Sequence, residues 1–381
     1  MTNKNPILPG ATLGMLGGGQ LGRMFTTAAQ TLGYNVVVLD PDTNSPAGII
    51  ADQHICANYT DEAALNQLAE LCDAVTTEFE NIPATTLSYL EAKTTVHPSS
   101  KALAQTQNRI IEKQFIESLG IKVAPYAAIR SAADIDAIAN TFHFPAILKA
   151  ASFGYDGKGQ VVCNHADDVH SAFTALNSVE CVLEQRINLE REVSTILARG
   201  QSGEITHFPI AENVHINGVL HSTTVPSNIP EQQAQNILKI ADTIADGLDY
   251  VGTMAVEFFI STEGDILTNE IAPRPHNSGH FTLDACETSQ FEQQVRMLCG
   301  LPSGSCNLTS PVVMINLLGD VWGKTRPHWD KLLSQPQNKL HLYGKKEARV
   351  GRKMGHFNVL ANHTEQAMEM AKQSFEDLKA D

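Results

Sequence analysis

Two short apolar segments joined by a glycine turn constrain this chain more than any other feature of its sequence. Residues 254–260 read MAVEFFI, residues 265–271 read DILTNEI, and Glu263 and Gly264 lie between them. Short apolar runs bounded by turn residues predict two antiparallel strands. Since alternate residues of a strand point to the same face, Glu257 and Glu270 are expected on the same side of the sheet.

This hairpin has the chemistry of a magnesium site. Carboxylate and amide oxygens are the protein ligands that Mg²⁺ takes beside nucleotide phosphates, and Glu257, Asn269 and Glu270 supply such oxygens. Spacing alone leaves a surface hairpin with two solvated acids open as the alternative. The next segment, APRPHNSGH at 272–280, carries two prolines, an arginine, two histidines and an asparagine. This composition is typical of a rigid loop beside bound anions, and a core strand would not carry it.

Length and charge limit the possible classes of protein. A chain of 381 residues with 43% apolar content is long enough for two or three domains. Its net charge of −15 disfavours a nucleic-acid binder, so a bound phosphate needs local positive charge or backbone N–H groups. No stretch approaches the roughly 20 apolar residues of a membrane helix, and the first residues lack the apolar run of a secretory signal. Seven scattered cysteines without a CxxC predict free thiols in a reducing cytoplasm and argue against structural zinc.

The N-terminal third predicts a nucleotide-type fold. Strands are expected at 11–17 and 35–40, with a helix to about Leu32 between them. The turn Gly17-x-Gly19-x-x-Gly22, with Asp40 beyond it, matches a dinucleotide fingerprint. Such a turn points backbone N–H groups towards an anion, and either NAD or a ribose phosphate could supply that anion. Glu80 follows a strand at 74–77, on the sheet edge where ligands bind, although a solvated loop acid fits equally well.

The middle of the chain predicts a lid over phosphates. A helix is expected over 101–119, including Arg109, and a strand over 144–150 with Lys149 inside an apolar run. A buried lysine requires an anionic partner. The segment 152–160, SFGYDGKGQ, carries three glycines within six residues, which suits either a phosphate-covering loop or a tight hairpin turn. Further strands are expected at 181–184 and 190–197, and an amphipathic helix over 230–248.

A basic stretch stands out near the C-terminus. HLYGKKEARVGRKMGH at 341–356 carries five basic residues against one acid, interleaved with three glycines. A charge run is usually a solvated face. Glycines allow close backbone approach, and lysine with arginine suits a phosphate monoester, so we predict an anion site here. A strand at 311–318 and a closing helix at 361–380 flank this stretch.

Three segments of the chain read MAVEFF…TNEIAPRPHNSGH, GGGQLGRM and YGKKEARVGRKMGH. Together they resemble the N5-carboxyaminoimidazole ribonucleotide synthetase branch of the ATP-grasp ligases. The resemblance covers essentially the whole chain. It implies an α/β (α+β) fold: a Rossmann-like domain at 1–107, an ATP-grasp domain at 108–300 with a lid at about 125–186, and a small C-terminal domain at 301–381 that binds the substrate phosphate. It also implies carboxylation of 5-aminoimidazole ribonucleotide with ATP, bicarbonate and Mg²⁺ through carboxyphosphate, by a cytoplasmic homodimer.

The resemblance also implies roles for individual residues. Glu257 and Glu270 would hold Mg²⁺. Asp156, Tyr155 and Lys149 would be catalytic, with Asp156 handling the amine proton. The ATP-binding set would be Arg109, Lys149, Gly154, Tyr155, Asp156, Gly157, Lys158, Gly159, Gln160, Glu184, Gln185, Arg186, Ile187, Glu192, His215, Asn269 and Glu270. The substrate-binding set would be Gln20, Leu21, Glu80, Asn277, Lys345, Arg352 and Lys353.

Three rival functions remain at this stage. A formate-using glycinamide ribonucleotide transformylase shares the fold, but it typically carries carboxylates where this chain has Gln20 and Asn277. An NAD-dependent dehydrogenase would use the glycine turn, but it leaves the paired glutamates and the basic stretch unexplained. A non-catalytic nucleotide sensor would bind ATP without turnover, and the intact metal ligands and Asp156 argue against it.

Overall fold

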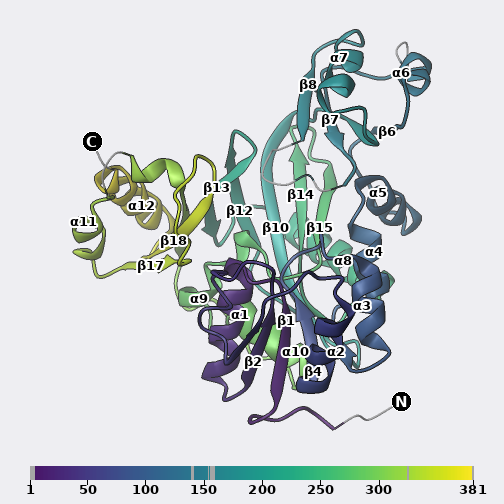
Figure 1. Cartoon of the computed structure of the whole chain (residues 1–381). Coiled ribbons are helices and arrows are strands. Elements are labelled where there is room, and N and C mark those ends of the chain that lie inside the picture. Colours follow the sequence, from purple (N-terminus) through teal and green to yellow (C-terminus); the bar gives the residue numbers. More distant parts are fainter. Residues whose placement is uncertain (1–4, 139–140, 153, 155–158, 324–325, 380–381) are drawn as a thin grey trace.

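The N-terminal unit is a five-stranded parallel sheet covered on both faces by helices. The computed structural model describes residues 5–138, 141–152, 154, 159–323 and 326–379 (Figure 1). The strand order is β3-β2-β1-β4-β5, with β1 Thr12–Leu16, β2 Asn35–Leu39, β3 Gln53–Ile55, β4 Ala74–Thr77 and β5 Thr95–Val96. Helices α1 (Gln20–Thr31) and α10 (Gln290–Leu298) pack on one face, and α2 (Glu62–Leu71) and α3 (Ala84–Glu91) on the other. The expected Rossmann-like arrangement is therefore present.

The single helix expected over 101–119 is wrong, because the chain forms two helices there. They are α4 (Ser100–Thr106) and α5 (Arg109–Ser118). The side chain of Asn108 accepts hydrogen bonds from the N–H groups of Ile110 and Ile111, which caps a new helix. Arg109 is consequently the first residue of α5, near the entry to the lid.

The lid is a separate four-stranded antiparallel sheet with two helices. The order is β6-β9-β7-β8, with β6 Tyr126–Ile129, β7 Ala146–Ala150, β8 Gln160–Cys163 and β9 Cys181–Gln185. Helices α6 (Ala132–Ile138) and α7 (Asp168–Ala175) cover one face through a small apolar core. This unit projects beyond the rest of the molecule at the top of Figure 1.

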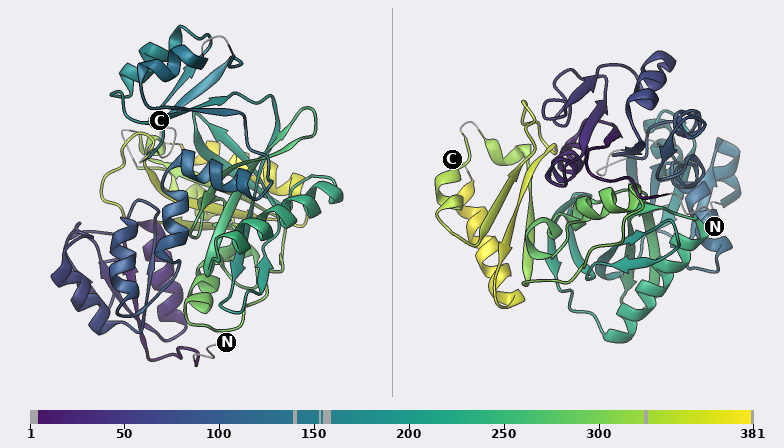
Figure 2. Two further views of the ribbon diagram at one scale, coloured as in Figure 1. Left: turned by 90° about the vertical axis from the view of Figure 1, so that its right-hand side faces the viewer. Right: turned by 90° about the horizontal axis from the view of Figure 1, so that it is seen from below.

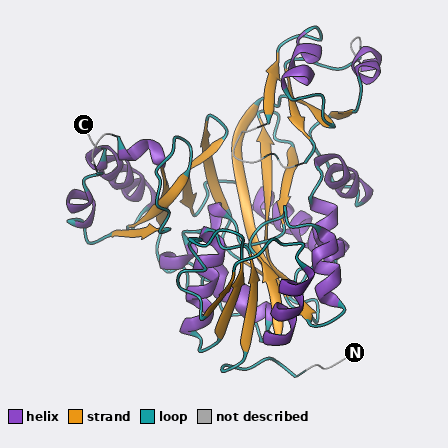
Figure 3. Cartoon of the chain, viewed as in Figure 1, coloured by secondary structure: helices purple, strands orange, loops and turns teal. Residues whose placement is uncertain are grey.

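A long antiparallel sheet forms the centre of the molecule (Figure 3). Its path is β15-β14-β10-β12-β13-β16-β18-β17, with β11 paired to β10. The strands are β10 Leu189–Arg199, β11 Ile205–His207, β12 Ala211–Ile216, β13 Val219–Val225, β14 Gly252–Ser261, β15 Ile266–Ala272, β16 Val312–Leu318, β17 Asn338–Leu342 and β18 Lys353–Leu360. Helix α8 (Glu231–Gly247) packs against the β10–β14 region through Ile237, Ala241 and Ile244. Because β16 pairs with β13, one sheet runs across the boundary predicted at residue 300.

The remaining elements belong to the C-terminal part and its junction with the central sheet. They are the short helices η1 (Asn277–Gly279), α9 (Thr282–Ala285), η2 (Gly319–Trp322) and α11 (Trp329–Leu333), and the closing helix α12 (Thr364–Leu378). Figure 2 shows the N-terminal and C-terminal units on neighbouring sides of the central sheet. Across the described residues, no helix combines the length and apolar character needed to cross a membrane.

Candidate functional site

The predicted metal hairpin forms as β14 and β15, and its two glutamates lie opposite each other. Glu257 and Glu270 are register partners, and a bulge on β15 places Asn269 in the irregular step beside them. Burial and the neighbouring Glu270 raise the pKa of Glu257 to about 7. In the described part of the chain, no group of three or more His, Cys, Asp or Glu side chains is arranged to hold a metal. The pair therefore fits a cation that takes its other ligands from phosphates.

Two lysines share one buried carboxylate near this hairpin. Lys149 Nζ lies 2.5 Å from Glu184 Oε2, and Lys113 Nζ lies 3.2 Å from Glu184 Oε1. The side chains of Lys149, Lys113 and Glu184 are 13%, 1% and 5% exposed. Burial alone would raise the pKa of Glu184, but the lysines lower it to about 2. Two lysine amines therefore face one carboxylate in this buried group.

Sequence analysis missed Lys113, and helical spacing was the signal that could have found it. Lys113 stands four residues after Arg109 in α5, so both side chains lie on one helix face. Arg109 Nη1 is 3.1 Å from Glu270 Oε2, and this links α5 to the metal hairpin. Glu112, also missed, accepts a hydrogen bond of 2.6 Å from the N–H of Ile271. Burial and the proximity of Glu270 raise its pKa to about 8.

The strand end at 184–187 borders a cavity. The N–H groups of Gln185 and Arg186 donate to the carbonyls of Pro125 and Pro145, at 2.8 and 3.0 Å. A cavity of about 710 Å³ is lined by Gln185, Arg186 and Ile187 together with residues of the β14–β15 turn. A cavity of that size at the hinge of the lid is large enough for a nucleotide base.

Glu192 and His215 come together on neighbouring strands β10 and β12. His215 Nδ1 lies 2.5 Å from Glu192 Oε2. Burial acts to lower the pKa of His215, but Glu192 and the glutamates of the hairpin raise it overall. Glu192 and His215, each predicted to bind ATP, therefore form a pair close enough to Glu257 and Glu270 to interact with them electrostatically.

The predicted glycine loop connects two paired strands, as expected for a strand–turn–strand lid. Lys149 and Gln160 are register partners in β7 and β8, and the carbonyl of Gly159 accepts from the N–H of Ala150 at 2.8 Å. Gly159 has φ +74°, which favours glycine. Gly154 lies within the described loop. Tyr155, Asp156, Gly157 and Lys158 lie outside the described residues.

The N-terminal glycine turn faces an anion, but the anion is a side chain of the protein. Glu78 accepts from the N–H groups of Gly19 and Gly22, at 2.6 and 2.7 Å, and Asp40 accepts from Gly18 at 2.7 Å. A Cβ at Gly19 would lie 2.5 Å from Glu78 Oε1. The glycines therefore make room for a carboxylate, and the N–H groups that a dinucleotide phosphate would use are already occupied. This geometry argues against the dehydrogenase.

Polar groups converge between the turn and the loop at 272–280. Arg274 donates to both oxygens of Glu80, from Nε at 2.5 Å and from Nη2 at 3.2 Å. Asn277 is 7% exposed, and neither polar atom of its amide has a partner. Buried amides are normally hydrogen-bonded, so Asn277 fits a residue that contacts a ligand. Gln20 and Leu21 begin α1 on the same side as Glu78.

The basic stretch lies next to the N-terminal glycine turn. Lys346 Nζ donates to Asn44 Oδ1 at 2.6 Å, and a Cβ at Gly344 would lie 3.6 Å from Arg23 Nη1. Lys345 Nζ donates to the carbonyl of Lys353 at 2.8 Å, and Arg352 donates to the carbonyl of Glu347 at 3.0 Å. The two segments thus lie side by side.

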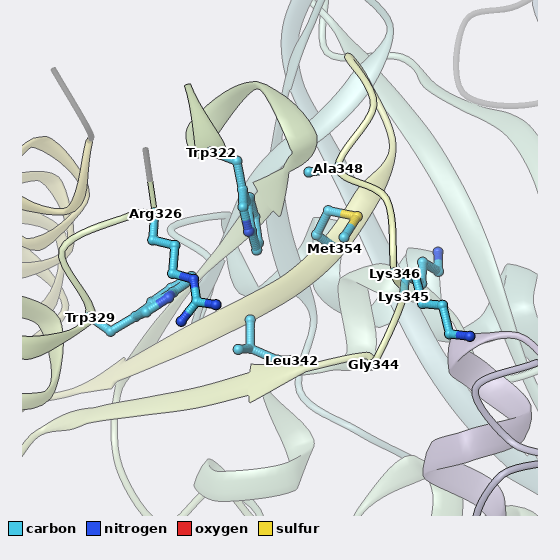
Figure 4. Close-up of a pocket in the computed structure, with 9 residues that line it drawn as sticks. All are labelled: Trp322, Arg326, Trp329, Leu342, Gly344, Lys345, Lys346, Ala348 and Met354. Atoms are coloured by element: carbon cyan, nitrogen blue, oxygen red, sulfur yellow. The ribbon is translucent and has the colours of Figure 1, made fainter. Parts of the chain in front are cut away.

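A second hollow, of about 440 Å³, lies on the C-terminal part (Figure 4). Trp322 and Trp329, the two tryptophans of the chain, line it with Leu342 and Met354, and their rings are 5.4 Å apart. Lys345 and Lys346 stand at its edge and point away from the indoles in Figure 4. Tryptophan fluorescence will therefore report on the C-terminal part of the molecule.

Comparisons with known proteins cover all three units. Residues 10–107 match the ribonucleotide synthetase preATP-grasp domain, 114–291 the ATP-grasp domain, and 312–370 the phosphoribosylaminoimidazole carboxylase C-terminal domain. The N5-carboxyaminoimidazole ribonucleotide synthase of Bacillus subtilis strain 168 is 43% identical over 358 residues, 94% of this chain and 93% of the relative.

Two solved structures are also similar over nearly the full length. An ADP complex of an N5-carboxyaminoimidazole ribonucleotide synthetase is 46% identical, with TM-score 0.92 and all of both chains covered. The Aspergillus clavatus N5-carboxyaminoimidazole synthase, in complex with ADP and 5-aminoimidazole ribonucleotide, is 30% identical, with TM-score 0.90, 97% of this chain and 98% of that chain covered.

Proposed function

This chain belongs to the N5-carboxyaminoimidazole ribonucleotide synthase family, and we propose that it assembles its active site from the hairpin, the shared lysines and the basic stretch described above. It is an ATP-grasp ligase that carboxylates 5-aminoimidazole ribonucleotide in purine biosynthesis. The proposal extends this activity to the named residues, to Mg²⁺ and to bicarbonate.

The reaction has two balanced steps. A bicarbonate oxygen attacks the γ-phosphorus of ATP, the bond to the β-phosphate oxygen breaks, and carboxyphosphate and ADP result. The exocyclic amine of the ribonucleotide then bonds to the carboxyl carbon and loses a proton, and inorganic phosphate leaves. Phosphoryl transfer depends mainly on positioning and charge neutralisation, which the buried cations of this site supply.

The observation that carries the proposal is the pair Lys149 and Lys113 on one carboxylate, next to the Glu257–Glu270 pair. Two lysines beside one carboxylate would favour ATP phosphates at this site. Glu257 and Glu270, with Asn269 beside them, would hold Mg²⁺, which would neutralise charge that develops on the phosphates. Arg109, now paired with Glu270, reaches the same region.

The nucleoside end of ATP would lie at the hinge of the lid. The cavity beside Gln185, Arg186 and Ile187 suits the adenine, and Glu192 suits the ribose hydroxyls. The loop at 152–160 would cover the phosphates and exclude water from carboxyphosphate. Asp156, which lies outside the described residues, stays the predicted group for the amine proton.

The ribonucleotide would lie between the N-terminal and C-terminal units. Lys345, Arg352 and Lys353 supply cations for its phosphate. Because Glu78 and Asp40 occupy the N–H groups of the glycine turn, the basic stretch would carry that phosphate, and the turn would contribute Gln20 and Leu21 instead. Glu80 and Asn277 lie between them and suit the ribose and the amine.

ADP release over a panel of acceptors tests the proposal. Turnover should require 5-aminoimidazole ribonucleotide, Mg²⁺ and bicarbonate together, with slow ATP hydrolysis on bicarbonate alone because carboxyphosphate breaks down. Glycinamide ribonucleotide with formate should give no more than background. Turnover with that second pair would favour the transformylase, and turnover with neither would remove the substrate assignment.

The oligomeric state and the location of the protein are part of the same proposal. A cytoplasmic homodimer is what the family resemblance implies, and it needs no nucleic acid or membrane partner. Sedimentation velocity over a range of concentrations tests the dimer: a monomer at all concentrations up to tens of micromolar would contradict it.

A further inference from the structure

Three histidines and a tyrosine form a stack where the ATP-grasp part meets the C-terminal strands, and all but His341 are buried. His280 follows η1, His341 lies on β17, and His356 lies on β18 opposite His341. The rings of His341 and His356 are 4.6 Å apart and nearly parallel, and the rings of His280 and His356 are 4.8 Å apart. His280 and His356 are 1% and 0% exposed. The function proposed above uses none of these side chains.

Hydrogen bonds fix the middle ring of the stack and the His341 side of it. Tyr343 Oη is 2.8 Å from His356 Nδ1, and His341 Nε2 is 2.8 Å from Asp284 Oδ2. Asn358 also donates to Asp284 Oδ2, at 2.6 Å, and to the carbonyl of His280 at 3.3 Å. Contacts therefore cross from β17 and β18 to the segment that contains η1 and α9.

The first end of the stack leads to the loop that carries Asn277. Gln290 donates to His280 Nδ1 at 3.1 Å, and it also bonds the N–H and the carbonyl of His276, each at 2.8 Å. A Cβ at Gly279 would lie 2.5 Å from Gln290 Oε1, so the loop is held tightly against this side chain. His280 and Gln290 together fix both sides of Asn277.

The second end leads to the basic stretch. Lys345 Nζ lies 5.7 Å above the ring of Tyr343 and donates to the carbonyl of Lys353, where β18 begins. Tyr343 N–H donates to the carbonyl of Met354 at 3.0 Å, so Tyr343 still belongs to the paired strands. A shift of the Tyr343 ring would therefore move both lysines.

We propose that His280, His356 and Tyr343 are positioning residues that hold Lys345 and Lys353 at a fixed distance from Asn277, so that one ribonucleotide can contact both at once. This inference rests on the proposed role of the basic stretch in binding the substrate phosphate. The physical reason is pre-organisation: two binding elements on separate parts of the fold recognise a single small ligand best when their separation does not fluctuate.

The stack bears on the ribonucleotide more directly than on the ATP site, which it approaches only through His276, 3.4 Å from Glu257. Among the described contacts, its rings touch none of Lys113, Lys149, Glu184 or Glu270, so its loss should affect the ribonucleotide more than the first half-reaction. Bicarbonate-dependent ATP hydrolysis without acceptor reports that half-reaction, and KM for the ribonucleotide reports the second site. A raised KM for the ribonucleotide with unchanged acceptor-free hydrolysis would indicate positioning, whereas a change in both would indicate general damage to the fold.

The test compares two replacements of His356 that have similar size, one with a polar amide and one without any polar atom. His356→Asn keeps a side-chain group near Nδ1 that can pair with Tyr343 Oη, while His356→Leu has similar bulk and cannot. His356→Leu should raise KM for the ribonucleotide about tenfold, which corresponds to about one lost hydrogen bond. KM for ATP and acceptor-free hydrolysis should stay within twofold of wild type. His356→Asn should restore KM to within about threefold, and Tyr343→Phe should match His356→Leu.

The control variant is His221→Leu. His221 makes a ring contact with Phe375 away from the stack, so His221→Leu should leave every constant unchanged. If His356→Leu lowers acceptor-free hydrolysis and ribonucleotide binding together, or if His356→Asn and His356→Leu behave alike, the positioning role is wrong. If His356→Leu does not fold, Tyr343→Phe alone decides: an unchanged KM refutes the inference. If Arg352→Ala leaves KM for the ribonucleotide unchanged, the proposed role of the basic stretch fails instead.

Discussion

Replacement of Glu184 by glutamine tests the charge balance at the centre of the proposed ATP site. Glu184 is the only carboxylate that any described contact places between Lys113 and Lys149, and all three side chains are largely removed from water. Glutamine keeps the shape and removes the charge. Both lysines then remain buried without their counter-ion.

The expected loss of stability is about 3–5 kcal/mol, the range found when one partner of a buried ion pair is removed. The lowering of the pKa of Glu184 from 4.5 to about 2 corresponds to about 3 kcal/mol in favour of its ionised form. In the wild type, burial of Lys149 costs free energy, as the lowered pKa of its amine shows, and this cost offsets part of the gain from ionised Glu184. In Glu184→Gln the cost of burying Lys149 remains while the gain is lost, so the expected loss of stability is not reduced.

Urea unfolding followed by far-ultraviolet circular dichroism measures the loss, and tryptophan fluorescence reports the C-terminal part separately. Asp265→Asn is the control, because its pair with Lys122 is on the surface, with side chains 54% and 71% exposed. Exposed pairs contribute about 0–1 kcal/mol. Wild type and Asp265→Asn should therefore unfold at nearly the same urea concentration, and Glu184→Gln should unfold at a clearly lower one.

The stability that Glu184 contributes should also depend on pH in a defined direction. Because the folded-state pKa of Glu184 lies below its unfolded value of 4.5, its stabilisation is complete above pH 4.5 and is lost as the pH falls towards 2. The difference between wild type and Glu184→Gln should shrink over that range. A Glu184→Gln protein that is less than 1 kcal/mol destabilised at pH 7, or a difference that grows below pH 4.5, would refute the reasoning.

Three further predictions concern the metal, the substrate phosphate and the glycine turn. Glu270→Ala should abolish ADP release yet unfold within about 1 kcal/mol of wild type, since its pair with Arg109 is partly exposed; near-normal turnover at ordinary Mg²⁺ would exclude the hairpin from the mechanism. Arg352→Ala should raise KM for the ribonucleotide far more than KM for ATP, and equal damage to both would indicate a disturbed fold. Glu78→Gln should cost about 1–3 kcal/mol in urea unfolding, because its amide N–H₂ opposes one of the two backbone N–H groups of Gly19 and Gly22; an unchanged midpoint would contradict this account of the turn.

Local sequence determined the elements that carry the site. The strands β14 and β15, with Glu257 opposite Glu270, follow from apolar runs, a turn and strand alternation, which are properties of neighbouring residues. The buried Lys149 predicted an anionic partner, but only the structure identified that partner as Glu184. The glycine turn predicted an anion at its N–H groups for the same local reason.

Tertiary structure decided which groups meet. Glu78 fills the glycine turn because β1 and β4 are parallel neighbours and end at the same edge, while their residues are far apart in the chain. Lys113 joins Lys149 only because α5 packs beside the lid sheet. The break between α4 and α5 was missed because Asn108 reads as an ordinary residue within a helical pattern until its capping bonds are seen.

The junction of the units shows the same division. The sequence determined that HNSGH and the basic stretch are unusual, and it predicted a ligand beside each of them. Only the pairing of β17 with β18, and of β16 with β13, brings His356 and His341 onto His280 and leaves Asn277 buried without a partner. Propensity and periodicity act over a few residues. The distances between binding groups are instead set by strand pairing and packing between segments that sequence spacing does not relate.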